Sequence, residues 1–250
     1  MRPLAIITGA GSGIGKALAV RLAEKDVDVI AVGRKLSKLE LTQKQNPERI
    51  KILQADVGND DGREKIVNAI SSGRSLKYLV HNAAVLDPVV PLSRMNIDDW
   101  RVHQAINVEG PLFLTQKLLP ALKGGRIIHI SSGAAHHPYA GWGAYSTSKA
   151  ALYMLYLILR EELKDTNIRV GSVRPGVVDT PMQEKIRGVS KSDFPALQKF
   201  ISLKEQNKLS APLMVAKFIS WILLETADDE YTAQEWDIRD ETNHEFWMES

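Results

Sequence analysis

Short apolar runs and amphipathic segments alternate along the first two thirds of the chain. Apolar runs bounded by turn residues predict strands, and they lie at Leu4–Ile7, Asp28–Val32, Ile50–Gln54, Leu76–Val80, Arg126–Ser131 and Ile168–Arg174. Apolar residues at helical spacing predict the intervening helices, which run to about Glu24 and over Leu36–Gln45, Asp60–Ser71, Asp98–Leu122 and Ala144–Lys164. This strand–helix–strand rhythm predicts an α/β fold, a doubly wound parallel sheet with helices on both faces.

The last third of the chain is less regular. A polar segment at about 181–210 carries only short helical patterns. Its length predicts a substrate loop or lid, and a plain surface insertion is the alternative. Ser210 before Ala211 and Pro212 predicts a helix that reaches about Glu225, and Glu235–Arg239 predicts a last strand. Within the long helix we expect Pro111 to cause a kink or to loosen the helix.

Composition narrows the class of protein. The chain has 250 residues, of which 44% are hydrophobic, so it can bury the core of one large domain. Its net charge is only +2 and its basic residues are scattered, which argues against a nucleic-acid partner. It contains no cysteine, which excludes a disulfide framework, a zinc–thiolate site and a cysteine nucleophile.

Targeting signals are not evident. Met1 to Pro3 lead straight into the first strand, without the apolar core and cleavage site of a signal peptide. The longest apolar segment, Ala150–Leu159, is shorter than the roughly 20 residues that a membrane-spanning helix needs. We therefore expect a cytoplasmic protein with no membrane partner.

A glycine-rich run, Thr8–Gly15, lies between the first strand and the first helix. Glycines allow a tight turn and a close approach of the backbone to a ligand, and the helix N-terminus offers unpaired N–H groups and a positive dipole end. This arrangement predicts a site for the pyrophosphate of a dinucleotide. A flexible turn is the alternative, because one glycine run is a weak signal.

Three polar side chains follow or flank the fifth predicted strand. Tyr145 and Lys149 are four residues apart, hence on one face of a helix, and Ser132 lies just after the strand. A nearby ammonium favours the phenolate, so it makes a tyrosine a usable acid or base. The neighbouring pair His136 and His137 has no carboxylate or cysteine at ligand spacing, and we expect no metal site.

Taken together, these motifs resemble the short-chain dehydrogenase/reductase family in order and spacing. The matching positions are Thr8-Gly9, Gly13-Ile14-Gly15, Asp56-Val57, Asn82-Ala83, Asn107, Ser132, Tyr145, Lys149, Pro175-Gly176 and Thr180. The resemblance covers nearly the whole chain and implies a single Rossmann-like domain and an NAD(P)-dependent oxidoreductase. It implies that Tyr145 is the acid/base, that Lys149 lowers the pKa of Tyr145 and holds the ribose, and that Ser132 orients the substrate carbonyl. Asn107 would keep a water in a proton relay to Lys149.

The resemblance also implies the cofactor contacts. They are expected from Thr8, Gly9, Ser12, Gly13, Ile14, Gly15, Arg34, Asp56, Val57, Asn82, Ala83, Tyr145, Lys149, Pro175, Gly176, Val178 and Thr180. At the end of the second strand Arg34 and Lys35 stand where NAD-specific relatives carry an acid, so we expect NADPH. The chain departs from the family pattern at two places: His81 and Ala84 flank Asn82-Ala83, and His129 replaces an asparagine in the fifth strand.

Within the family the chain is similar to the sepiapterin reductase and benzil reductase branch, on the segments Gly141–Tyr145, Pro175–Gln183 and Trp236–Asp240. This implies reduction of a ketone beside another carbonyl, in an α-dicarbonyl or pterin-like substrate. Trp142 would offer a flat apolar face, and Asp240 would either anchor the substrate or only cap the last strand and face solvent.

Other functions stay open. A general short-chain alcohol dehydrogenase or an acyl reductase could use the same residues, and a catalytically silent dinucleotide-binding sensor could keep the fold without turnover. The segments Asp98–Leu122 and Tyr145–Lys164 carry more apolar residues than one sheet-facing stripe requires, so a homodimer or homotetramer is expected.

Overall fold

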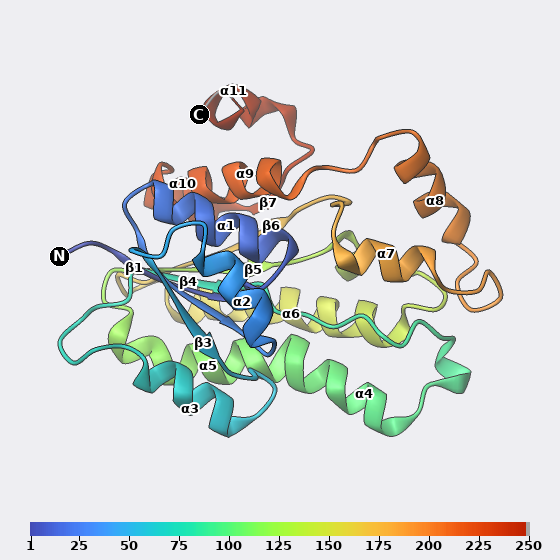
Figure 1. Cartoon of the computed structure of the whole chain (residues 1–250), viewed down its shortest axis with the longest axis horizontal. Helices are drawn as coiled ribbons and strands as arrows, with labels where there is room; N and C mark the ends of the chain where they lie inside the picture. Colours follow the sequence, from blue (N-terminus) through green and yellow to red (C-terminus); the bar gives the residue numbers. More distant parts are fainter. Residues whose placement is uncertain (249–250) are drawn as a thin grey trace.

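A twisted parallel sheet forms the centre of the molecule (Figure 1). The computed structural model describes residues 1–248, and the sheet within them has seven strands in the order β3-β2-β1-β4-β5-β6-β7. The strands are β1 (Leu4–Thr8), β2 (Asp28–Gly33), β3 (Ile50–Gln54), β4 (Tyr78–His81), β5 (Arg126–Ile130), β6 (Arg169–Arg174) and β7 (Glu235–Asp237). All neighbouring strands pair in parallel. The predicted doubly wound parallel sheet is therefore confirmed.

Helices cover both faces of this sheet (Figure 1). One layer contains α1 (Gly13–Glu24), α9 (Pro212–Leu224), α10 (Asp228–Ala233) and α11 (His244–Trp247), with α2 (Leu36–Gln43) packed at the β2–β3 edge. The other contains α3 (Asp60–Asn68), α4 (Ile97–Gln104), α5 (Gly110–Leu118) and α6 (Gly143–Glu162). Two further helices, α7 (Pro181–Arg187) and α8 (Leu197–Glu205), follow β6 and lie beyond the end of the sheet.

The alternation of side chains along a strand explains the continuous apolar runs. In β1, Ala5 and Ile7 belong to the core under α1 and α9, while Leu4 and Ile6 belong to the core under α5 and α6. A strand between two helical layers must be apolar on both faces, unlike a strand with one face in water. The hydrophobic pattern therefore predicts strands well here, because every residue of β1 is buried.

The long helix expected over Asp98–Leu122 is present and is loosened next to Pro111. Helical structure runs without a gap through α4, a π-helical segment Ala105–Glu109 and α5. The N–H of Gly110 bonds to the carbonyl of Ala105, the wider spacing that defines a π turn. Pro111 follows this turn directly and has no N–H to continue the regular bonding pattern. The expected loosening at the proline therefore takes the form of a π turn just before it.

Smaller differences concern the last third of the chain. Ser210 does not cap α9; it forms a bridge to Val178, which ties the start of this helix to the segment after β6. The polar stretch at 181–210 does contain two short helices, as its pattern indicated. Neither α10 nor α11 was expected, because each is too short for helical periodicity to be visible. Within residues 1–248 no helix is both long and apolar enough to cross a membrane.

Candidate active site

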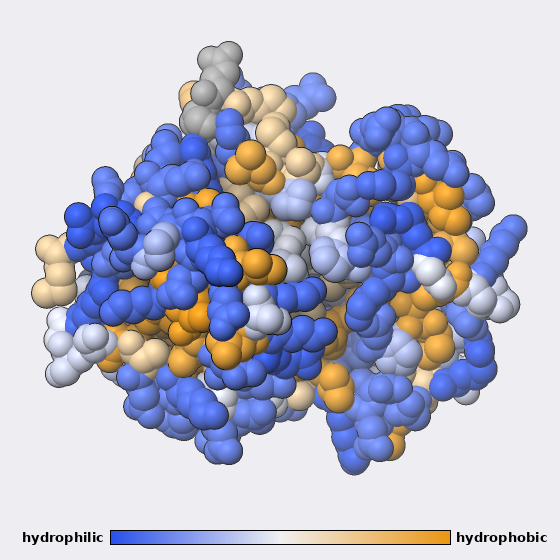
Figure 2. All heavy atoms as spheres, viewed as in Figure 1, coloured by the Kyte–Doolittle hydropathy of each residue, from blue (hydrophilic) through white to orange (hydrophobic). Residues whose placement is uncertain are grey.

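A cavity of about 410 Å³ opens at the carboxyl ends of the central strands. Its walls come from the glycine loop, the ends of the strands, α6, α7 and α8. The molecular surface is hollowed between the main body and the part that carries α7 and α8 (Figure 2). Ligands of open α/β sheets bind where the carboxyl ends of the strands diverge, so the cavity is the candidate site.

The glycine loop presents an open helix N-terminus to this cavity. Ser12, the N-cap of α1, makes no side-chain capping bond, and the first turn of the helix carries no acidic residue. Gly13 has φ +53°, a conformation that favours glycine. A Cβ on Gly15 would lie 2.4 Å from Nδ2 of Asn82, so only glycine fits there. The free N–H groups and the positive helix end fit a phosphate anion.

Thr8 and Asn82 support the glycine loop through hydrogen bonds. The Thr8 hydroxyl donates to the Val80 carbonyl at 3.2 Å and accepts from the N–H groups of Asn82 and Ala83, each at 3.0 Å. The Asn82 amide donates to the carbonyls of Thr8 at 2.8 Å and of Gly9 at 3.2 Å. Thr8 and Gly15 are absent from the cavity wall, whereas the other predicted cofactor residues line it. Thr8 therefore fixes the loop to β4.

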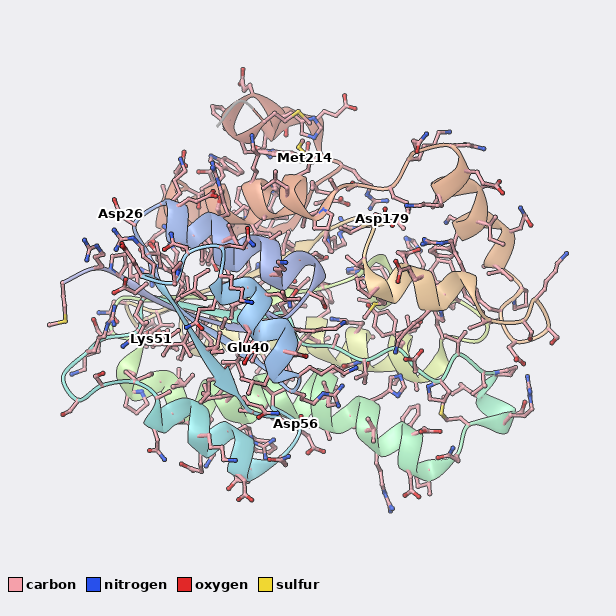
Figure 3. The ribbon with its side chains drawn as sticks, viewed as in Figure 1. Asp26, Glu40, Lys51, Asp56, Asp179 and Met214 are labelled. Atoms are coloured by element: carbon pink, nitrogen blue, oxygen red, sulfur yellow. The ribbon has the colours of Figure 1, made fainter. Side chains whose placement is uncertain are left out.

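A charged pair lies at the ends of β2 and β3. Arg34 and Asp56 both line the cavity, with the guanidinium 3.8 Å from the carboxylate. Asp56, which follows β3 (Figure 3), also accepts from the N–H of Gly58 at 2.9 Å. The Arg34 side chain is 58% exposed, so most of its donors remain available to an anion.

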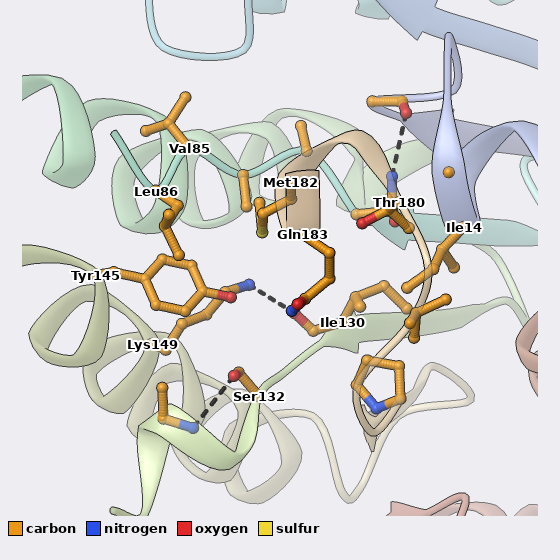
Figure 4. A pocket seen from close by; sticks show the side chains of 18 of the residues that line it. Ile14, Val85, Leu86, Ile130, Ser132, Tyr145, Lys149, Thr180, Met182 and Gln183 are labelled. Carbon is orange, nitrogen blue, oxygen red and sulfur yellow. Dashed lines mark hydrogen bonds between the residues drawn. The ribbon is translucent and has the colours of Figure 1, made fainter. Parts of the chain in front are cut away.

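The structure brings Ser132, Tyr145 and Lys149 together in the cavity wall (Figure 4). Ser132 follows β5, and its hydroxyl accepts from the N–H of Ala134 at 3.1 Å. Tyr145 and Lys149 lie on successive turns of α6. The Lys149 ammonium donates to the Ile130 carbonyl at 2.7 Å and lies 5.8 Å from the centre of the Tyr145 ring.

Burial shifts the pKa of both Tyr145 and Lys149. It raises the pKa of the Tyr145 phenol, while a hydrogen bond with Ser132 lowers it in part. It lowers the pKa of Lys149 to about 8. The expected lowering of the tyrosine pKa by Lys149 is not found in the protein alone, because desolvation outweighs the other effects on this phenol.

Asn107 lies behind the cavity wall, not in it. Its Oδ1 accepts from the N–H of Val85, and its Nδ2 donates to the Val85 carbonyl and to the Ser148 hydroxyl, each at 2.9 Å. Ser148 in turn donates to the Tyr145 carbonyl at 2.8 Å. Asn107 therefore ties α6 to the segment after β4, and its place in a proton relay stays a prediction.

An aromatic chamber adjoins the two hydroxyl groups. Trp142 stacks on Phe194 with ring centroids 4.9 Å apart and contacts the Tyr145 ring edge-on at 5.7 Å. Phe200 and Tyr139 complete this wall. Trp142 thus lines the cavity as the sequence indicated.

Asp240 is not brought to the cavity. Its exposed carboxylate accepts from the N–H of Thr242 at 3.1 Å and from the Thr242 hydroxyl at 2.7 Å, so it caps the turn after β7. Its neighbour Arg239 lines the cavity instead. Of the two roles expected for Asp240, this position fits the solvent-facing cap and not the substrate anchor.

Some residues of the wall are not singled out by the sequence. They are contributed by the segment after β4 and by the loop before α6: Val85, Leu86, His137 and Tyr139. No spacing rule points to them, since their position depends on how irregular segments fold over the sheet. The expected substrate loop at 181–210 also contributes to the wall, through Met182, Gln183, Ile186, Lys199 and Phe200.

The two departures from the family pattern lie side by side beneath the site. The rings of His81 and His129 are 5.0 Å apart, on paired strands. His81 contacts the Thr115 hydroxyl at 2.8 Å. Burial lowers the pKa of both rings, that of His129 to about 3, so both are neutral at pH 7.

Among residues 1–248 no cluster of three potential metal ligands occurs, and His136 pairs with Glu235 at 2.8 Å.

Known proteins with the same arrangement identify the family. A model of the short chain dehydrogenases matches residues 3–190. Benzil reductase ((S)-benzoin forming) of Bacillus cereus is 36% identical over 235 residues, 89% of this chain and 94% of that protein. The solved structure of the short chain dehydrogenase/reductase YIR035C from Saccharomyces cerevisiae has a TM-score of 0.90 at 30% identity, with 98% and 99% of the two chains covered. The closed form of serine dehydrogenase complexed with NADP+ has a TM-score of 0.78 at 26% identity, with 94% of each chain covered.

The chain therefore belongs to the short chain dehydrogenase family. The parallel sheet, the glycine loop and the Ser132–Tyr145–Lys149 group are consistent with this family. It is an NAD(P)-dependent oxidoreductase, and its resemblance to the benzil reductases, expected from the sequence, is confirmed.

Proposed function

We propose that this protein is an NADPH-dependent carbonyl reductase that acts on aromatic or heteroaromatic α-dicarbonyl compounds. The observation that carries the proposal is the aromatic chamber of Tyr139, Trp142 and Phe200, with Phe194 stacked behind Trp142, beside the hydroxyls of Ser132 and Tyr145. Flat apolar walls suit a planar ring, and two converging hydroxyls suit one carbonyl oxygen.

The residues of the glycine loop fit the cofactor. The first turn of α1 would hold the pyrophosphate, and Arg34 would contact a 2′-phosphate, since its guanidinium is largely exposed at the end of β2. A related serine dehydrogenase is known as a complex with NADP+. When bound, the reduced nicotinamide supplies the hydride.

The polar side chains would then manage the proton and the developing charge. Ser132 would donate a hydrogen bond to the carbonyl oxygen and hold it beside Tyr145. Tyr145 would transfer its phenolic proton to that oxygen as the carbonyl is reduced. Lys149 would stabilise the phenolate left behind, and Asn107 would support the relay that returns a proton.

The α-dicarbonyl class follows from the resemblance and the chamber together. The Bacillus cereus relative is named for the reduction of benzil, a compound with two adjacent carbonyls between two rings. A pterin-like substrate, suggested by the sequence, stays a prediction. Asp240 as its anchor would require the turn after β7 to move, since the carboxylate now binds Thr242.

The segment 181–210 is proposed as the substrate loop, because α7 and α8 form one wall of the cavity. Ion pairs join this segment to its surroundings: Lys204 binds Asp179 at 2.5 Å (Asp179 is labelled in Figure 3), and Lys185 binds Asp87.

The cytoplasmic location expected from the sequence also stays a prediction.

The test is a substrate comparison with the purified protein. We expect NADPH oxidation with benzil, and a catalytic efficiency at least about tenfold lower with NADH, which is the effect of one lost charged contact. Good activity on simple secondary alcohols with none on any vicinal dicarbonyl would contradict the proposal and favour a general alcohol dehydrogenase. Tight NADPH binding without turnover of any carbonyl would favour the silent sensor.

A further inference from the structure

One polar side chain of the cavity wall has no assigned role. Gln183 lies in the first turn of α7, lines the cavity, and is only 8% exposed. Its backbone N–H bonds to the Thr180 carbonyl at 2.9 Å, but its side-chain amide makes no hydrogen bond within residues 1–248. Oε1 of this amide is shielded from solvent, whereas Nε2 is open to the cavity that the residue lines. A side-chain N–H donor that faces a binding cavity without a protein partner is available to a ligand.

The surroundings of Gln183 offer it no protein partner. Its neighbours Met182 and Ile186 belong to the apolar cluster that contains Leu86, Trp142 and Tyr145. Figure 4 shows the Gln183 side chain reaching from α7 into the cavity whose wall also holds Tyr145 and Lys149. An apolar ligand that covered the Nε2–H donor would cost free energy, and a ligand that accepts its hydrogen bond avoids that cost.

The geometry favours the substrate over the cofactor as that ligand. Thr180 faces the glycine loop, since a Cβ on Gly13 would lie 3.0 Å from its Cγ2. Helix α7 packs on the aromatic chamber through Met182 and Ile186, the residues on either side of Gln183 in the helix. Ser132 and Tyr145 already provide two donors for the reacting carbonyl oxygen. An additional amide at the chamber therefore suits a second oxygen of the substrate.

We propose that Gln183 recognises the second carbonyl of an α-dicarbonyl substrate, with Nε2 donating to the oxygen that is not reduced. The inference rests on the proposed function and adds to it the residue that distinguishes a diketone from a simple ketone. A monoketone would cover the Nε2–H donor beside the aromatic chamber without accepting its hydrogen bond. Sites built to hydrogen-bond one substrate group reject analogues that lack it for this reason.

A matched pair of substrates tests this role. Benzil and deoxybenzoin have the same two rings, but deoxybenzoin has a methylene in place of one carbonyl. The variants are Gln183→Leu, which removes the amide at similar volume, and Gln183→Glu, which keeps the shape but removes the donor. We expect either change to lower kcat/KM for benzil roughly ten- to a hundredfold, and to leave kcat/KM for deoxybenzoin unchanged or higher.

Three further measurements separate this role from others. The Kd of NADPH should be unchanged in Gln183→Leu, and its Tm should not fall, because an unpaired amide is replaced by an apolar group. Gln198→Leu, at an exposed glutamine of α8, is the control and should alter neither substrate.

The inference is overturned by equal losses on both substrates, by an unchanged benzil activity, or by a weaker Kd for NADPH, which would assign the amide to the cofactor. If the wild-type protein reduces benzil but the variants do as well, the inference alone fails. If the wild-type protein reduces no vicinal dicarbonyl, the proposed function fails together with it.

Discussion

At the scale of a single residue, Lys149 is buried, although its proposed role needs a positive charge. It is 3% exposed, which disfavours its charge and lowers its pKa to about 8, yet its proposed role needs the ammonium. Within residues 1–248 its ammonium makes one hydrogen bond, to the Ile130 carbonyl, which fixes the side chain and does not neutralise it. A buried cation of this kind is typical of a functional site, where anionic ligands complete the environment.

The stability of the cofactor-free protein should therefore depend on pH through Lys149. Below about pH 8 the lysine is protonated in both states, so the full cost of burying its charge is present. Between the folded pKa of about 8 and the unfolded value of 10.5 the unfolded state binds more protons, so stability rises with pH. Denaturation of wild type and Lys149→Met at pH 7 to 10 measures this: the free-energy difference between them should shift in favour of wild type above about pH 8. A difference that stays constant across this range would show that the lysine is not buried as a cation.

Residue-scale prediction from sequence succeeded where the fold fixes a position. Ser132 follows a strand and Tyr145 and Lys149 share a helix face, and together with the other motifs of the chain this spacing was enough to predict that they meet. It was less informative where a role depends on the path of a loop. Gln183 and Asp240 are both near motif residues in the sequence, yet one lines the cavity and the other faces solvent.

At the scale of elements, the π turn between α4 and α5 shows what periodicity does and does not reveal. Pro111 next to the turn is a local signal that the helix is loosened there. The contacts of Asn107 in this turn with Val85 and Ser148 join distant parts of the chain, so the local pattern does not report them. Strand order was likewise not evident from the sequence, whereas the parallel arrangement was.

Helices α5 and α6 also carry the apolar side chains that motivate an oligomer. Phe113 on α5 and Met154 and Ile158 on α6 are 39%, 53% and 43% exposed. We expect light scattering to give two or four times the mass of one chain at micromolar concentration, because covering such residues is favourable. The double variant Met154→Glu/Ile158→Glu should shift the mass toward one chain, while Leu41→Glu, at an exposed leucine of α2, should not. A wild-type monomer would defeat this expectation.

At the scale of the whole molecule, the sheet brings distant segments to one edge. The glycine loop after β1, Arg34 after β2, Ser132 after β5 and Pro175 after β6 all line one cavity, although they span most of the chain. Parallel strands make this possible, because their carboxyl ends point the same way. The segment of α7 and α8 then closes one side with residues suited to an aromatic substrate.

The proposed carbonyl reduction depends most on Tyr145 as its proton donor. The most direct measurement is single-turnover reduction of benzil by NADPH with wild type and Tyr145→Phe, alongside the Kd of NADPH for each. The variant removes the phenolic proton and little else, so we predict a rate at least about a thousandfold lower with a nearly unchanged Kd. Tyr153→Phe, two turns further along α6, should keep the wild-type rate. Near-normal turnover by Tyr145→Phe would contradict the account.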